Sequence, residues 1–151
     1  MNTFISPEKF NATVNINVMN CLGFALNQTQ EGDYTLKRAI DIDTYRPLNP
    51  NDTPVDAFIR KAKELGYNIK QVATAEETAG KTAFWLWGWF SYYSMFEGVV
   101  RYDDFHVVRK NQDGSFVHKP DGHQPAEHIE DFKEFTQKYY VEDTPYIFVL
   151  V

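Results

Sequence analysis

Residues 104–120, DFHVVRKNQDGSFVHKP, constrain the fold more than any other segment of this chain. Two short runs rich in apolar residues flank NQDG, and Asp-Gly between such runs is typical of a β-hairpin. The pattern fits a three-residue loop from Gln112 to Gly114, with Gly114 in the left-handed backbone region that glycine adopts most easily. The segment therefore predicts two antiparallel strands.

This loop also predicts which side chains share a face of the hairpin. It pairs Asn111 with Ser115 and therefore Val108 with His118. Because side chains alternate along a strand, His106 shares the face of Val108, roughly 5–8 Å from His118 between Cβ atoms. A two-residue loop would place the two histidines on opposite faces. We expect the longer loop, which lets the two imidazoles form a hydrogen bond.

The only cysteine, Cys21, lies in NCLGFALNQ, residues 20–28, where the apolar positions suggest a short helix that begins at the cysteine. A helix N-terminus and a neighbouring imidazolium both favour the thiolate, which is the nucleophilic form. Cys21 as nucleophile, His106 as base and His118 as the residue that orients the base would make a Cys-His-His site. The alternative is a buried, inert thiol with two histidines of the surface or the core.

The remaining elements indicate an α+β fold with a mostly antiparallel sheet. The best-signalled helix follows Thr53 as N-cap and Pro54 at the first helical position, and it ends at Gly66. We read the first twenty residues as coil or an edge strand. The other expected elements are strands over 67–74, 82–90 and 145–151, the last two of them central, and a helix over 125–140 with Ile129, Phe132 and Phe135 inward.

Composition and charge narrow the function classes. The chain has 151 residues, a formal net charge of −6 and a sequence pI near 5.1, without the Lys/Arg cluster that a nucleic-acid binder needs. Its most apolar window, residues 83–96, is shorter than the ~20 residues that span a bilayer. The start does not resemble a signal peptide, so we expect a cytoplasmic protein, or an effector or phage product delivered by another route. We expect no membrane partner and no cofactor, and one cysteine excludes an internal disulfide.

At these residues the chain resembles the NlpC-type branch of the papain-like cysteine peptidases. NCLGFAL, followed by DFHVVRKNQDGSFVHKPDG, is similar to a group of its mostly uncharacterised members, in which a cysteine at a helix N-terminus precedes two histidines on adjacent strands. The resemblance implies a papain-like fold with Cys21 as nucleophile, His106 as base and His118 as the orienting residue. The backbone N–H of Cys21 would hold the oxyanion, with Asn20 or Asn17 as a further donor.

The chain also departs from this pattern. The stretch between Cys21 and His106 is long for a compact member, so residues 1–151 are expected to form one domain with an insertion within 30–80, and residues 30–100 could cover the cleft as a lid. Asp121 stands where glycine is expected. The cell-wall enzymes of this branch are exported and often fused to wall-binding modules. We expect neither feature here, which weakens peptidoglycan as a substrate unless another system delivers the protein.

The expected function is cysteine-dependent hydrolysis or transfer at a peptide or protein amide, as in a peptidase, amidase or deamidase. The first alternative is a catalytically silent papain-like scaffold that binds or inhibits another protein. Trp85, Trp87 and Trp89 share one face of the expected strand; they are core residues or, if exposed, the contact surface for such a partner.

The second alternative is a metal-dependent hydrolase. His106, His118, His123 and His128 could hold zinc, although their spacing matches no standard ligand set and no acidic or thiolate partner accompanies them. A solvated loop that carries the last two histidines is the simpler interpretation, and we expect no metal.

Overall fold

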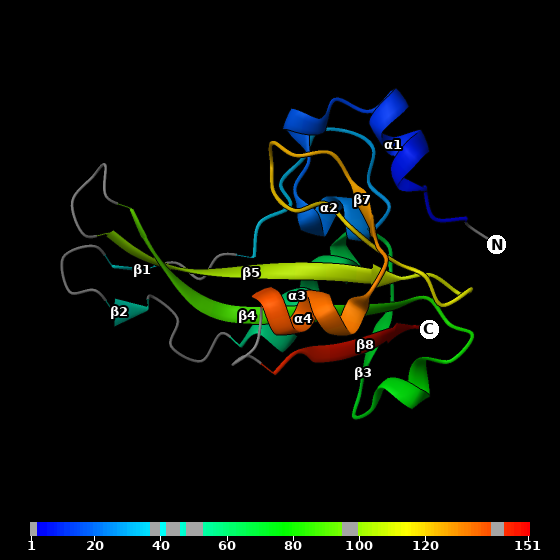
Figure 1. Cartoon of the computed structure of the whole chain (residues 1–151). Coiled ribbons are helices and arrows are strands. Elements are labelled where there is room, and N and C mark those ends of the chain that lie inside the picture. Colours follow the sequence, from blue (N-terminus) through cyan, green and yellow to red (C-terminus); the bar gives the residue numbers. More distant parts are fainter. Residues whose placement is uncertain (1–2, 37–39, 42–45, 48–52, 95–99, 140–143) are drawn as a thin grey trace.

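The structure is a computed structural model that describes residues 3–36, 40–41, 46–47, 53–94, 100–139 and 144–151 (Figure 1). For residues 40–41, 46–47, 89–94 and 100–104 it describes the backbone only. A six-stranded antiparallel sheet forms the centre, with helices packed on it. The predicted α+β class is confirmed. The expected insertion within 30–80 stays a prediction.

The sheet places the most apolar strands in its interior. Every neighbouring pair is antiparallel. The strands predicted over 82–90 and 145–151 are both central, because each has a partner on either side. The order across the sheet is β3 (Ile69–Val72), β8 (Tyr146–Leu150), β4 (Ala83–Ser94), β5 (Val100–Lys110), β6 (Phe116–His118) and β7 (Glu127–Ile129). A separate two-stranded ladder joins β1 (Ile40–Asp41) to β2 (Arg46–Pro47).

The long hairpin of β4 and β5 contains a bulge at Trp89. Gly88 lies opposite Phe105, and the next pair along the ladder is Phe90 with Asp104, so Trp89 is an extra residue on β4. A bulge interrupts the alternation of side chains along a strand. The prediction that three tryptophans share one face therefore holds along the regular ladder for Trp85 and Trp87 only.

Four α-helices lie within the described residues. The best-signalled helix is confirmed as α3: Thr53 Oγ1 accepts a hydrogen bond from Asp56 N at 3.1 Å, and Gly66 follows the helix at φ 92°. The helices are α1 (Pro7–Thr13), α2 (Cys21–Ala25), α3 (Pro54–Glu64) and α4 (Phe132–Tyr139), with 3₁₀ turns over Ile16–Val18 and Ala75–Thr78.

The reading of the first twenty residues as coil or an edge strand is wrong, because they contain α1. Ser6 Oγ accepts a hydrogen bond from Lys9 N at 3.2 Å, and Pro7 occupies the first turn. Ser-Pro-Glu is a helix-start signal, but the helix is only two turns long and shows little apolar periodicity. Its capping residues were the one signal that could have located it.

The helix predicted over 125–140 is only partly present. Residues Glu127–Ile129 form β7, and α4 begins at Phe132. Ile129, Phe132 and Phe135 are three residues apart, a spacing that also occurs on one face of a helix, and this spacing suggested one continuous helix. All three side chains do pack inward against the sheet, as predicted.

Two buried clusters cover the two faces of the sheet. The α2–α3 face is the face against which Phe24 of α2 and Phe58 of α3 pack; its cluster includes Phe84 and Phe148. The α4 face is covered by Phe132 and Phe135; its cluster consists of Ala83, Trp85, Trp87, Val108 and Val149.

Trp85 and Trp87 of β4 are core residues. Trp85 and Trp87 are 4% and 1% exposed beneath α4, and Trp85 meets Phe132 edge to face at 5.6 Å between ring centroids. Of the two interpretations of these residues, the buried positions agree with core packing. The side chain of Trp89 lies outside the described residues.

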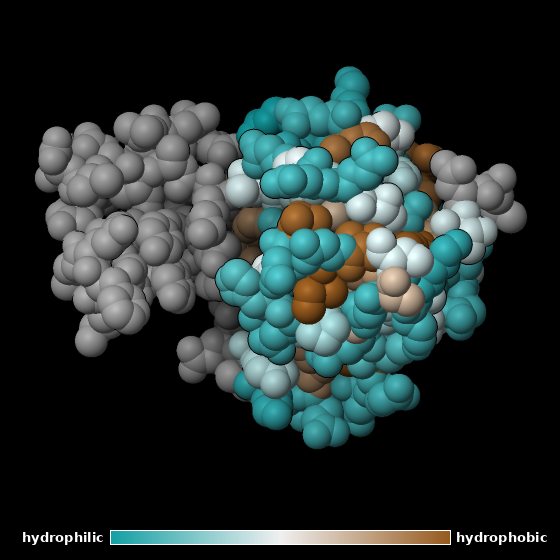
Figure 2. Space-filling model, turned by 90° about the horizontal axis from the view of Figure 1, so that it is seen from above, coloured by the Kyte–Doolittle hydropathy of each residue, from teal (hydrophilic) through white to brown (hydrophobic). Residues whose placement is uncertain are grey.

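The described surface in Figure 2 is mostly hydrophilic, with a small apolar patch near its centre. Within the described part of the chain, Tyr139 and Val151 are the large hydrophobic side chains that are strongly exposed. No helix among the described residues is long and apolar enough to cross a bilayer.

Candidate thiol and histidine site

The hairpin that carries the two histidines has the predicted turn. Asn111 N donates to Ser115 O at 2.8 Å, and Gly114 has φ 93°. The ladder then pairs Lys110 with Phe116 and continues one residue further along each strand. Because the loop has three residues, the two histidines share a face, as expected.

The histidines are in direct contact. His106 Nε2 lies 2.9 Å from His118 Nδ1, and the two rings are nearly perpendicular, with their centroids 5.2 Å apart. Both residues are buried. The predicted hydrogen bond between the two imidazoles is confirmed.

A carboxylate extends this contact into a chain of three groups. Glu127 on β7 is paired with His118 in the ladder, and its Oε1 lies 2.8 Å from His118 Nε2. Phe135 of α4 packs edge to face on His118 at 5.0 Å. A hollow of about 210 Å³ opens beside the three groups, lined also by Pro120, Gln124, Phe135 and Tyr139.

Burial sets the protonation of both imidazoles. It lowers the pKa of His106 to about 3, with the charge of His118 adding to the effect. It also lowers the pKa of His118, although the hydrogen bond and the charge of Glu127 oppose this. Both histidines are therefore neutral at pH 7, so each ring has one N–H donor and one nitrogen acceptor.

Cys21 is the first residue of α2, and its side chain is buried at 6% exposure. Asn20 caps the helix: its Oδ1 accepts from Gly23 N at 3.0 Å, while its Nδ2 donates to Tyr34 O at 2.6 Å. Asn20, expected as an oxyanion donor, thus holds the helix start and a neighbouring loop. Asn17 lies in a 3₁₀ turn and is exposed.

The structure brings the two histidines together and places Cys21 in a different cluster. Cys21 packs with Phe105 and Val107 in the cluster of the α2–α3 face. His106 lies between these residues on β5, so its side chain projects toward the other face, where it lines the hollow under α4. The contact between Cys21 and His106 that a triad requires therefore stays a prediction, whereas the contact between His106 and His118 is present.

The backbone pairing between β5 and β6 is short and does not extend to the histidine pair. The backbone ladder between β5 and β6 ends at Arg109 and Val117, so beside His106 the two strands are linked by the imidazole pair and not by a ladder bond. Helix α2 contacts both β5 and β6. In Figure 1, α2 lies beside β5, and α4 lies in front of the sheet.

Lys119 is a charged neighbour of the thiol that sequence reasoning missed. Its side chain is fully buried, and Nζ donates to Asp121 O at 2.6 Å. Burial lowers the pKa of Lys119, while the charges of Asp121 and Cys21 act in the opposite direction. The thiol and the ammonium group therefore interact electrostatically. The signal was available in sequence, because Lys119 directly follows His118.

Arg109 is a buried cation on the same strand as His106. It is fully buried and donates from Nη1 to Phe24 O at 3.1 Å and from Nη2 to Ile5 O at 2.6 Å. Its guanidinium carbon lies 4.9 Å from the centroid of the Phe24 ring. Arg109 thus fastens the end of α2 and the N-terminal segment to β5.

The alternative zinc site is not assembled. His128 pairs with Glu8 at 2.6 Å, and His123 lies in the turn stabilised by Asp121. Among the described residues, no group of three or more His, Cys, Asp or Glu side chains is arranged to hold a metal ion.

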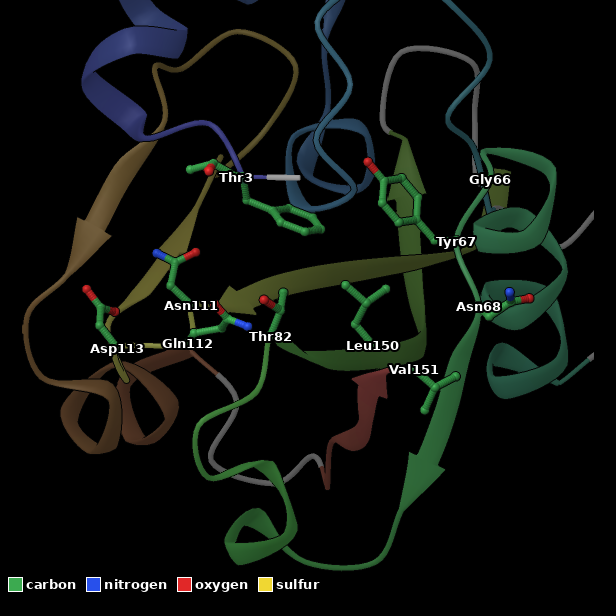
Figure 3. Close-up of a pocket in the computed structure, with 11 residues that line it drawn as sticks. Thr3, Gly66, Tyr67, Asn68, Thr82, Asn111, Gln112, Asp113, Leu150 and Val151 are labelled. Carbon is green, nitrogen blue, oxygen red and sulfur yellow. The ribbon is translucent and has the colours of Figure 1, made fainter. Parts of the chain in front are cut away.

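A larger hollow of about 600 Å³ lies at the turn end of the hairpin (Figure 3). Its labelled lining residues include Tyr67, Asn68, Thr82 and Gln112, and Cys21 and the two paired histidines do not line it. Its volume is greater, but its walls offer no thiol or imidazole, so the candidate chemistry lies elsewhere.

Comparison with protein-family models, with curated proteins and with solved structures finds no match for this chain.

Proposed function

We propose that this protein is a cysteine-dependent amide hydrolase or transferase on a papain-like scaffold of the NlpC type, acting on a peptide or protein amide. Cys21 is the nucleophile and His106 the base. The observation that carries the proposal is the hydrogen bond of 2.9 Å between His106 and His118, which is anchored in turn by Glu127. A base held by a second residue is the arrangement that nucleophilic catalysis requires.

The thiol has the surroundings of a nucleophile. Cys21 is at the start of a capped helix, where backbone N–H groups are unused by the helix, and the ammonium group of Lys119 interacts with it. In the proposed reaction the thiol of Cys21 approaches Nδ1 of His106 beyond Arg109 and Val117, where the β5–β6 ladder ends. The first backbone N–H groups of α2 would then face the oxyanion.

The proposed reaction proceeds in two balanced steps. The thiol proton moves to His106, the sulfur attacks the amide carbon, and a C–S bond replaces the C–N bond as His106 returns the proton to the leaving amine. Water then attacks the thioester, with His106 taking its proton, and releases the carboxylic acid and the thiol. An amine in place of water gives the transferase reaction.

Alkylation by iodoacetamide tests the proposal, because the chain has a single cysteine and mass spectrometry can assign the product without ambiguity. At pH 6 an unperturbed thiol is about 0.3% thiolate, so a Cys21 whose proton is accepted by His106, at a helix start and near the charge of Lys119, should react faster than free cysteine. The rate should fall sharply in His106→Ala and stay unchanged in His123→Ala, the matched control in an exposed turn.

Covalent turnover is the second readout. With p-nitrophenyl acetate as acyl donor, the wild-type chain should release a burst of p-nitrophenolate and carry the acyl group on Cys21, and Cys21→Ala should do neither. Slow alkylation at pH 6 that is independent of His106, together with no acyl group on Cys21, would refute the proposal.

A catalytically silent scaffold that binds another protein is the second candidate. One observation favours it: Cys21 is buried at 6% exposure, among the hydrophobic side chains of the α2–α3 face. The same alkylation experiment separates the two candidates, since a silent scaffold predicts a slow rate with an ordinary thiol pH dependence.

A further inference from the structure

Glu127 is a member of the histidine chain that the Cys-His-His pattern does not include. It lies at the first residue of β7, two strands away from the strand of His106, and the β6–β7 ladder places it directly opposite His118. Its side chain is 58% exposed, whereas that of His118 is 5% exposed. The carboxylate therefore stands at the mouth of the hollow, with one oxygen turned inward to the imidazole.

The hydrogen atoms of the chain follow from this contact. A carboxylate can only accept, so the contact of 2.8 Å places a hydrogen on Nε2 of His118. A neutral His118 then has its lone pair on Nδ1 and accepts from Nε2–H of His106 across 2.9 Å. His106 must therefore carry its hydrogen on Nε2 and its lone pair on Nδ1.

We propose that Glu127 is a positioning residue: through His118 it selects the tautomer of His106 in which Nδ1 is the proton acceptor. The catalytic meaning of this role rests on the proposed function, in which Nδ1 receives the thiol proton of Cys21. When the proton arrives, His106 becomes an imidazolium whose Nε2–H remains bonded to His118, and the carboxylate of Glu127 stabilises the new charge through His118. No other group is oxidised, reduced or released in this step.

The tautomers can be measured directly. In ¹⁵N NMR spectra of the full chain at pH 7.5, His106 and His118 should each show a protonated Nε2 and an unprotonated Nδ1. In Glu127→Leu the carboxylate acceptor is lost, so the other tautomer of both rings should become populated. Glu127→Gln keeps an acceptor oxygen without the charge and should retain most of the wild-type tautomer.

The reaction provides a separate readout. Relative to wild type, Glu127→Leu should slow the alkylation of Cys21 at pH 6 by about tenfold, the size of effect typical of residues that orient a functional imidazole. Glu127→Gln should recover part of this loss. Glu130→Gln is the matched control, because it removes an exposed carboxylate just beyond the same strand, and it should change neither the spectra nor the rate.

The outcomes distinguish this inference from the proposed function. Unchanged tautomers in Glu127→Leu would overturn the positioning role, whatever the alkylation rate shows. Shifted tautomers in a protein whose wild-type thiol is unreactive would support the positioning role and refute the hydrolase. Glu127 is largely exposed, so the variants should fold; if Glu127→Leu does not, shifts in the Glu127→Gln spectra relative to Glu130→Gln decide the question.

Discussion

The two faces of the sheet bury polar groups in different ways. Arg109, which packs against α2 on the α2–α3 face, is a buried cation that donates to the carbonyl oxygens of Phe24 and Ile5, and Lys119 is a second buried cation that donates to Asp121 O. On the α4 face the buried polar groups are neutral imidazoles, bonded to each other and to a carboxylate. A cation that is bound to carbonyl groups keeps its charge over a wide pH range. A histidine that is buried in its neutral form destabilises the fold when acid protonates it. We therefore expect substitution of a buried cation to lower the free energy of unfolding by the same amount at neutral and mildly acidic pH, and acid to lower it through the histidines of the α4 face.

The largest effect should come from Arg109 on the α2–α3 face. Arg109→Met removes the donors to Phe24 O and Ile5 O and leaves two carbonyls without them in the interior, so the free energy of unfolding should fall by about 3–5 kcal/mol. Urea unfolding at pH 7 measures the loss. Burial lowers the pKa of Arg109 only to about 10, so the loss should be the same at pH 6.

Lys110→Met is the matched control for Arg109→Met. Lys110 is the next residue on β5, but it is only half-buried, and its Nζ donates to Thr78 Oγ1 at 2.9 Å. Its substitution should cost about 1 kcal/mol or less. An equal loss in both variants would contradict the view that Arg109 fastens α2 to the sheet.

The second-largest effect should be a fall in the free energy of unfolding at acidic pH, caused by the histidines of the α4 face. His106 has a pKa of about 3 when folded and about 6.5 when unfolded, so its stabilising effect is complete above pH 6.5 and is lost as the pH falls from 6.5 toward 3. Between pH 7 and pH 5 this histidine alone should cost about 2 kcal/mol of unfolding free energy. His118 acts in the same direction, because its pKa is also lowered.

Urea unfolding of wild type and His106→Leu at the two pH values measures this contribution. The variant should be less stable at pH 7, because His118 loses its partner, but its further loss at pH 5 should be smaller than that of wild type. His123→Ala, which removes an exposed histidine, should keep the wild-type dependence. An undiminished acid loss in His106→Leu would show that other groups cause it.

The sequence could predict the parts of this site that depend on local rules. The turn chemistry of Asp113 and Gly114 determined the loop length, and alternation then placed His106 beside His118. Alternation also separates Val107 from His106, but it cannot say which face receives α2. That choice depends on packing between segments that are distant in sequence, so the face on which α2 packs could not be predicted.

The contact of Glu127 with His118 could not be predicted from the sequence, for a related reason. The strand of Glu127 has three residues and no periodicity of its own, and it forms only because β6 offers a free edge. The spacing of Phe132 and Phe135 extended the apparent helix backward over it. A carboxylate that acts through a long-range strand pair leaves no local signal, whereas Lys119 at least adjoins a residue that the pattern identified.

The two faces also differ in how strongly their helices are packed against the sheet. Phe132 is half-buried and packs on Phe116 and Trp85, so Phe132→Ala should lower the free energy of unfolding by about 2 kcal/mol. Because α4 is short, its amides should exchange hydrogen faster in this variant, with little change in β4. Phe58→Ala on the α2–α3 face removes a fully buried ring and should speed exchange throughout the sheet. Equal acceleration of β4 in both variants would contradict this difference.

The smallest expected effect concerns the start of α2 and links stability to the thiol. Asn20→Ala removes the cap on Gly23 N and the bond to Tyr34 O, so it should cost about 1–2 kcal/mol of unfolding free energy. Asn20→Asp keeps the acceptor for Gly23 N but loses the donor to Tyr34 O, so it should recover only part of the loss. If the first turn of α2 helps to stabilise the Cys21 thiolate, Asn20→Ala should also slow alkylation at pH 6, while Asn17→Ala, in the exposed 3₁₀ turn, changes neither quantity. A loss of stability without any change in alkylation rate would mean that the cap supports the helix and leaves the thiol unaffected, and it would favour the silent scaffold over the hydrolase.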